Sequence, residues 1–138
     1  MPIAALAVVG GLCLFVALIE SWLLVALLAG SYGPLQKLLP NRQDLVRSHI
    51  DYLMMALFLF VFYGLCRLLP AAPPGAIIAA ACLGAFFNPF AFLVHAMKPA
   101  FKEAPPTSFF TAMMASCVAT TVGFAGIGWT ISAAALSQ

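Results

Sequence analysis

Four long apolar stretches, separated by short breaks rich in proline, glycine or charge, dominate the chain. They cover about residues 3–29, 44–69, 75–96 and 108–136. A helix needs about 20 mostly apolar residues to cross the hydrocarbon core of a bilayer, and each stretch is long enough. A soluble domain of 138 residues, of which 64% are hydrophobic, could not bury so much apolar surface. The sequence therefore predicts a single all-α membrane domain, residues 1–138, with four transmembrane helices.

The breaks between the stretches are short, so neighbouring helices are expected to run antiparallel in a bundle. Glycine and proline at 30–34 end the first helix, and Asn41 or Asp44 is a candidate N-cap for the second. Proline-rich segments at 70–74 and 105–108 precede the third and fourth helices. The first stretch lacks a basic leading region and is longer than the apolar run of a signal peptide, so we expect it to remain as a helix.

Basic residues gather on one side of this topology. The side with the first and third connections carries Lys37, Arg42, Arg47, Lys98 and Lys102. The other side carries Arg67 alone, so the positive-inside rule places the first and third connections in the cytoplasm and both termini outside. A net charge of +2 is too small to indicate a nucleic-acid partner. The cysteines lie one per helix without CxxC or zinc spacing, which favours a packing role.

Ionisable residues inside spanning segments are rare and are functional candidates by default. The stretch DLVRSHIDYLMM, Asp44 to Met55, places several of them at the start of the second helix. Arg47 and Asp51 are four residues apart, so they share a helix face and can pair. Asp44 and Arg47 suit an entry turn at the headgroup level. Anchoring does not require His49, and histidine is the commonest metal ligand, so His49 is the stronger functional candidate.

The third helix carries a polar stripe formed by Asn88, Phe92 and His95, which are four and three residues apart. Pro89, inside the stripe, lacks an amide hydrogen, which frees the carbonyl group of Ala85 and is expected to kink the helix. Asn88 either caps the broken turn or faces a site. His95 either lies at the interface or faces the same site.

Glu20 lies about nine residues before the end of the first helix, which is ~14 Å at the rise of an α-helix. Its carboxyl is either neutral or cation-bound, or it pairs with Arg47 or bonds to Trp22 or a serine. The topology predicts a polar cavity, open to the cytoplasmic side, in the half of the bundle that holds Glu20, His49, Asp51, Asn88 and His95. Close helix contacts are expected at Gly84, Gly123, Gly126 and Gly128.

A four-helix membrane bundle with inward-facing histidines is a natural haem site, because neutral imidazole binds iron and the macrocycle packs on apolar walls. Twelve phenylalanines and six methionines can supply such walls. The sequence has no CxxCH motif, which excludes covalent c-type attachment. One histidine ligand would leave an open iron position for Lewis-acid chemistry, whereas two would suit electron transfer.

Two short segments resemble a known family. RSHID, Arg47 to Asp51, resembles the A/R-x-H motif of styrene oxide isomerase, and its H-I-D part is similar to the A-H-L-E-G motif of hydroxylaminobenzene mutase. NPFAF, Asn88 to Phe92, is similar to N-V-G-F-Y on the third helix of the isomerases. The resemblance covers about two helices of four. It implies a homotrimer in the bacterial inner (cytoplasmic) membrane, with His49 as the axial ligand of haem b.

The resemblance also implies a reaction. Ferric iron would act as a Lewis acid on a small apolar epoxide, which rearranges to a carbonyl compound by a 1,2-hydride shift; a mutase-like variant would convert an aryl hydroxylamine to an aminophenol. Residues expected at the cofactor are His49, Tyr52, Met55 and Phe92. Residues expected to line or support the substrate pocket are Asn88, His95 and Asp51. Met55 stands where the relatives carry asparagine, and Phe92 where the isomerases carry tyrosine, so two polar groups beside the iron are missing.

Two other hypotheses stay open at this point. In the first, His49 and His95 bind opposite faces of a haem that carries electrons. In the second, the chain holds no cofactor and is a small transporter or structural membrane subunit with Glu20 as its proton site.

Overall fold

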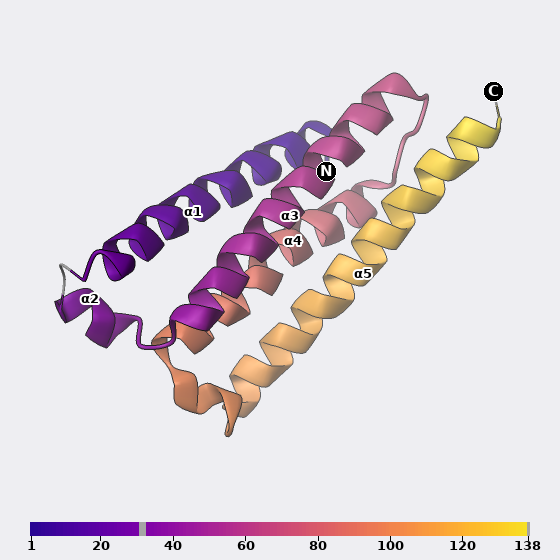
Figure 1. The fold of residues 1–138 in the computed structure, drawn as a ribbon. Coiled ribbons are helices and arrows are strands. Elements are labelled where there is room, and N and C mark those ends of the chain that lie inside the picture. The colour runs from indigo at the N-terminus through magenta and orange to yellow at the C-terminus, as the bar shows by residue number, and fades with distance from the viewer. Residues whose placement is uncertain (31–32, 138) are drawn as a thin grey trace.

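The computed structural model describes residues 1–30 and 33–137, which form a bundle of four long helices (Figure 1). These are α1 (Ala4–Leu28), α3 (Arg42–Leu68), α4 (Gly75–Met97) and α5 (Thr107–Leu136). A short helix, α2 (Gly33–Leu38), and a 3-10 helix, η1 (Pro99–Lys102), lie in the connections. Each long helix has the length and apolar composition to cross a membrane, and the described residues contain no strand. The predicted all-α fold with four membrane helices is confirmed.

The helices begin and end at residues that favour a helix end. Gly30 has a φ of +68°, the left-handed conformation that favours glycine, and it follows the last turn of α1. The side chain of Asn41 accepts a hydrogen bond from the amide of Asp44, so Asn41 is the N-cap of α3. Pro74 and Pro106 stand directly before α4 and α5, where a missing amide hydrogen costs no helical hydrogen bond.

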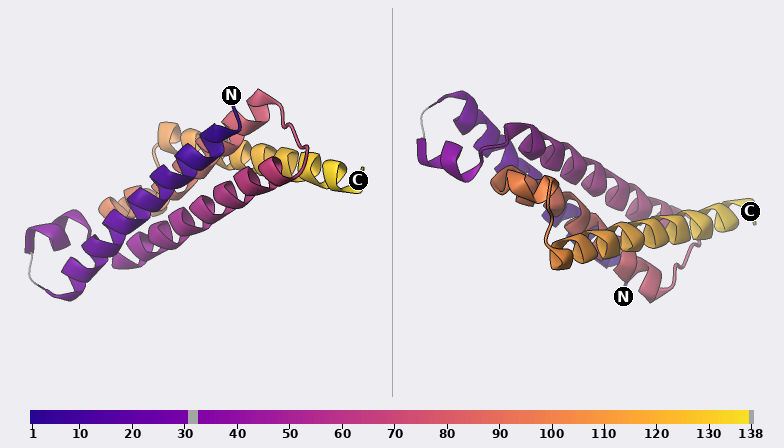
Figure 2. Two further views of the ribbon diagram at one scale, coloured as in Figure 1. Left: turned by 90° about the horizontal axis from the view of Figure 1, so that it is seen from above. Right: turned by 90° about the horizontal axis from the view of Figure 1, so that it is seen from below.

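The long helices run antiparallel in sequence order, with α3 and α4 at the centre of the bundle. α1 packs mainly on α3 and more lightly on α4, while α5 packs mainly on α4. Both termini lie at the end of the bundle opposite α2 and η1 (Figures 1 and 2). The first and third connections therefore share one end, as predicted. Which side of the membrane that end faces stays a prediction.

Two glycines set the close approach of α4 and α5. A β-carbon at Gly84 would overlap the backbone of Thr120, and a β-carbon at Gly123 would overlap the backbone of Ala81. Each glycine therefore lies directly against the main chain of the opposite helix. Small residues are the usual means by which membrane helices reach this separation. The predicted role of Gly84 and Gly123 in helix contact is confirmed.

Gly126 and Gly128 on α5 were predicted to have the same role, but only Gly126 contacts α4. A β-carbon at Gly126 would lie 2.7 Å from Cγ2 of Ile77 on α4, so this glycine is also a contact. At Gly128 a β-carbon would meet no atom of the described chain within 4 Å, so the prediction for Gly128 is wrong. The reason is geometric: two residues along an α-helix turn the side-chain direction by about 200°.

Candidate functional site

α4 continues as one helix past Pro89 but lacks one backbone hydrogen bond there. We call the turn from Ala85 to Pro89 the break, or broken turn, of α4. Pro89 is fully buried, and it cannot donate a hydrogen bond to the carbonyl group of Ala85 one turn earlier. The thiol of Cys13 on α1 lies 3.8 Å from that carbonyl oxygen and serves as a weak donor to it. The carbonyl that the sequence predicts to be free is thus reached by a side chain 72 residues away. This contact gives Cys13 a specific role beyond filling space.

Two side chains from α3 also donate to carbonyl groups near this break. The hydroxyl of Tyr52 donates to the carbonyl oxygen of Phe86 at 3.0 Å, and Tyr52 is only 1% exposed. The hydroxyl of Ser48 lies 3.3 Å from the carbonyl oxygen of Pro89. The weakened turn of α4 is therefore held by polar groups from both α1 and α3. Such partners are what allow a proline inside a membrane helix.

Glu20 joins this network from α1. Its side chain is 1% exposed, and its Oε1 lies 2.6 Å from the hydroxyl oxygen of Ser48. Its Oε2 is also buried and has no hydrogen-bond partner among the described residues. Of the alternatives that the sequence left open for Glu20, the structure shows the hydrogen bond to a serine and no ion pair with Arg47 within the described chain.

His49 is fixed by the backbone of α1. Its Nδ1 lies 2.9 Å from the carbonyl oxygen of Ala17, and a carbonyl oxygen can only accept. Nδ1 therefore carries the hydrogen in the neutral ring, and Nε2 keeps its lone pair. This is the tautomer that a metal-binding histidine needs when it coordinates through Nε2.

The polar stripe of α4 faces α5. Oδ1 of Asn88 accepts from the thiol of Cys117 at 3.1 Å, and the side-chain donor to the freed Ala85 carbonyl is Cys13. The ring of His95 lies 6.5 Å from that of Phe92 and 5.4 Å from that of Phe109, between centroids. Nδ1 of His95 is buried without a hydrogen-bond partner in the part of the chain that the structure describes.

The predicted convergence of these polar residues is therefore incomplete. His49 and Glu20 contact the α1–α3 pair and the break in α4, whereas Asn88 and His95 contact α5. A groove of about 550 Å³ lies between α4 and α5 and is almost wholly apolar. Its walls include Phe87, Phe90, Val94, Phe109, Met113 and Ser116, and none of the predicted polar site residues lines it. This groove is therefore not the predicted polar cavity, which stays a prediction. The polar side chains named above are used in contacts between helices.

The remaining predicted site residues lie on α3. The hydroxyl of Tyr52 makes the buried contact with Phe86, and Met55 is half-buried against the core shared by all four long helices. Asp51 is half-buried and has no ion pair among the described residues. The spacing allowed Arg47 to pair with Asp51, but the structure shows a different pair: Nη1 of Arg47 lies 3.1 Å from Oδ1 of Asp44.

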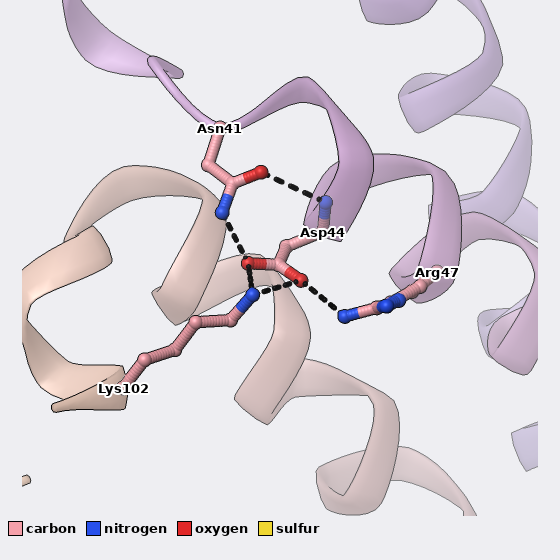
Figure 3. Close-up of polar contacts among 4 residues, drawn as sticks. All are labelled: Asn41, Asp44, Arg47 and Lys102. Carbon is pink, nitrogen blue, oxygen red and sulfur yellow. Dashed lines mark hydrogen bonds and ion pairs between the residues drawn. The ribbon is translucent and has the colours of Figure 1, made fainter.

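Asp44 is the centre of a cluster that sequence reasoning missed (Figure 3). Its carboxylate is fully buried and accepts from Nδ2 of Asn41 at 2.5 Å and from Nη1 of Arg47 at 3.1 Å. Nζ of Lys102 lies 2.6 Å from one carboxylate oxygen and 2.8 Å from the other. Arg47 is half-exposed and Lys102 about one-third exposed. The cluster ties the start of α3 to η1 across 58 residues.

Comparisons with known protein families, with curated proteins and with solved structures find no match for this chain. The described residues also contain no group of three or more His, Cys, Asp or Glu side chains that could hold a metal ion.

Proposed function

We propose that this chain is a haem-b membrane isomerase, similar to styrene oxide isomerase, in which His49 binds the iron. The observation that carries the proposal is the hydrogen bond from Nδ1 of His49 to the carbonyl oxygen of Ala17, 2.9 Å long. Metal-bound histidines commonly donate their other ring N–H to a backbone carbonyl, which orients the ring and strengthens it as a ligand. The donor chemistry of His49 therefore fits an axial ligand.

The placement of the two histidines favours one iron ligand over two. His49 bonds to α1, and His95 packs against Phe109 of α5. His49 can keep its bond to Ala17 while Nε2 binds iron, but His95 would have to leave its contact with α5 to reach the same iron within one chain. A single ligand leaves the opposite face of the iron open, which suits Lewis-acid chemistry better than electron transfer.

When bound, ferric haem would supply a Lewis acid for the oxygen of a small epoxide, whose rearrangement to a carbonyl compound needs no added redox partner. The chain's own part is to hold the imidazole through Ala17 and to keep water away with the apolar surfaces of α1 and α3. A small apolar substrate can enter from the bilayer, which gives a reason for the enzyme to be embedded there. Asn88 and His95 face α5, so we do not assign them to the reacting centre of the same chain.

Absorption spectra test the ligand assignment. The protein is expressed with ample haem, purified in mild detergent, and compared with His49→Ala and with His95→Ala as the matched control. We expect a Soret band in the wild type and in His95→Ala, and loss of the band in His49→Ala with partial recovery on adding imidazole. An aryl epoxide assay should lose aldehyde formation together with the band.

Each other spectral outcome contradicts part of the proposal. A Soret band that survives unchanged in His49→Ala removes His49 as the ligand. A band that both substitutions alter supports the electron-carrier hypothesis instead. A wild-type protein without any band, from cells well supplied with haem, rejects haem binding.

A further inference from the structure

The hydrogens around Ser48 do not balance if Glu20 is ionised. Ser48 has one hydroxyl hydrogen and two close oxygens, Oε1 of Glu20 at 2.6 Å and the carbonyl oxygen of Pro89 at 3.3 Å. The Pro89 carbonyl can only accept, and an ionised carboxylate can only accept as well. Each contact has a hydrogen of its own, rather than one hydrogen shared between two acceptors, only if Glu20 carries a proton and donates it to Ser48, while Ser48 donates to Pro89.

The charges around Glu20 point to the same protonation state. The titratable side chains around it are Cys13 on α1 and Tyr52 on α3, whose thiol and hydroxyl donate to carbonyl groups and so keep their hydrogens. His49 on α3 bonds to the Ala17 carbonyl and makes no ion pair with Glu20 in the described chain. On α4 the titratable Cys82 faces Cys13, and the turn against Glu20 presents backbone carbonyl groups. In the described chain the cations Arg47 and Lys102 are paired with Asp44 instead. An ionised Glu20 would be a buried charge without a countercharge among the described residues, which is costly inside a membrane.

We propose that Glu20 is a buried proton-binding site whose proton completes a hydrogen-bond chain from α1 through Ser48 to the broken turn of α4. When this proton leaves, the Ser48 hydroxyl turns to the carboxylate and the Pro89 carbonyl loses its side-chain donor. Proton binding at Glu20 is then coupled to the packing of α1 and α3 against the break. Carbonyl groups at interrupted membrane helices are a recurrent setting for proton and cation sites. The proposal does not depend on haem or on the isomerase reaction.

Infrared spectroscopy of the full chain in detergent detects a protonated carboxyl by its C=O stretch, which is separate from carboxylate bands. The sequence contains only two glutamates, Glu20 and the exposed Glu103. Protein carrying Glu103→Gln and ¹³C-labelled glutamate therefore reports on Glu20 alone. At pH 7 we expect a carboxylic-acid band that shifts with the ¹³C label. In Ser48→Ala the frequency of this band should also change, because the acceptor of the acid proton is gone.

A second variant checks the assignment without the label. Glu20→Gln should remove the band and keep the helical circular dichroism, because an amide N–H can still donate to Ser48. Exchange of Na⁺ for choline should leave the wild-type band unchanged. Three results would each overturn the proposal. The wild type could lack a ¹³C-shifted acid band at pH 7, the band could persist in Glu20→Gln, or the band could appear only after Na⁺ is removed. Because no readout involves haem, a failure here is distinct from a failure of the haem assignment.

Discussion

Gly123→Leu should separate α5 from α4 and lower the free energy of unfolding by about 3 kcal/mol or more, the upper range for an overpacked contact. A β-carbon at Gly123 would overlap the backbone of Ala81, not a side chain that could rotate away. The helices can relieve that overlap only by moving apart. The expected cost therefore exceeds that of Gly126→Leu, where the first obstacle is the side chain of Ile77.

Gly128→Leu is the matched control for this prediction. It makes the same substitution two residues from Gly126 on the same helix, and no atom of the described chain lies within 4 Å of its β-carbon. It should change the unfolding free energy by less than about 0.5 kcal/mol. The measurement is equilibrium unfolding in mixed micelles with increasing sodium dodecyl sulfate. Equal stability of the leucine variants at Gly123 and Gly128 would contradict the glycine contact.

The effect should appear in tertiary structure more than in helix content. α5 packs mainly on α4, and only 11% of the residues in its most apolar 18-residue segment are buried. Its own backbone hydrogen bonds stay satisfied in a micelle whether or not it touches α4. Gly123→Leu should therefore keep its helical circular dichroism while the groove between α4 and α5 opens.

The helices, the connections between them and the carbonyl group freed by Pro89 were predictable because their signals are local. The expected kink of α4 stays a prediction. Apolar length marks the spans, Gly30 marks the end of α1, and Pro89 necessarily frees the carbonyl of Ala85. The stripe of Asn88 and His95 was also predictable, because helical spacing alone places both on one side of α4.

The direction in which that stripe faces could not be predicted. Spacing along one helix does not say how the helix is rotated against its neighbours, and the glycines at 84, 123 and 126 decide that α4 turns one face to α5. His49 and His95 therefore occupy the same half of the bundle without meeting. The donor to the Ala85 carbonyl, Cys13, likewise could not be predicted, since 72 residues separate the two in sequence.

Asp44 shows the same limit for charge pairs. Local spacing allowed Arg47 to pair with either Asp44 or Asp51, at three or four residues. The structure pairs Arg47 with Asp44, which also receives Nζ of Lys102 from 58 residues away, a contact that no local spacing could predict. A buried carboxylate with two cations and an amide donor is favoured over a half-exposed pair, because its remaining lone pairs are also satisfied.

Asp44→Ala should therefore lower the free energy of unfolding by about 2–4 kcal/mol, since it removes charge-assisted hydrogen bonds and leaves Lys102 without its anion. Glu103→Ala, which removes an exposed acid next to Lys102 in sequence, should cost less than about 0.5 kcal/mol. Detergent unfolding as above measures both.

A double-mutant cycle with Lys102→Ala separates the pair from the other partners of Asp44. Lys102→Ala alone should cost less than Asp44→Ala, because Arg47 and Asn41 still bond to the carboxylate. The coupling energy should reach at least about 1 kcal/mol and should change little with added salt, because Asp44 is fully buried and poorly screened. A coupling near zero would mean that this end of the bundle is held by backbone contacts, such as the bond from the Asn41 amide to the Ala96 carbonyl at the end of α4, and not by charge. A large coupling would make the ion cluster the element that fixes the α4–α5 connection against the start of α3.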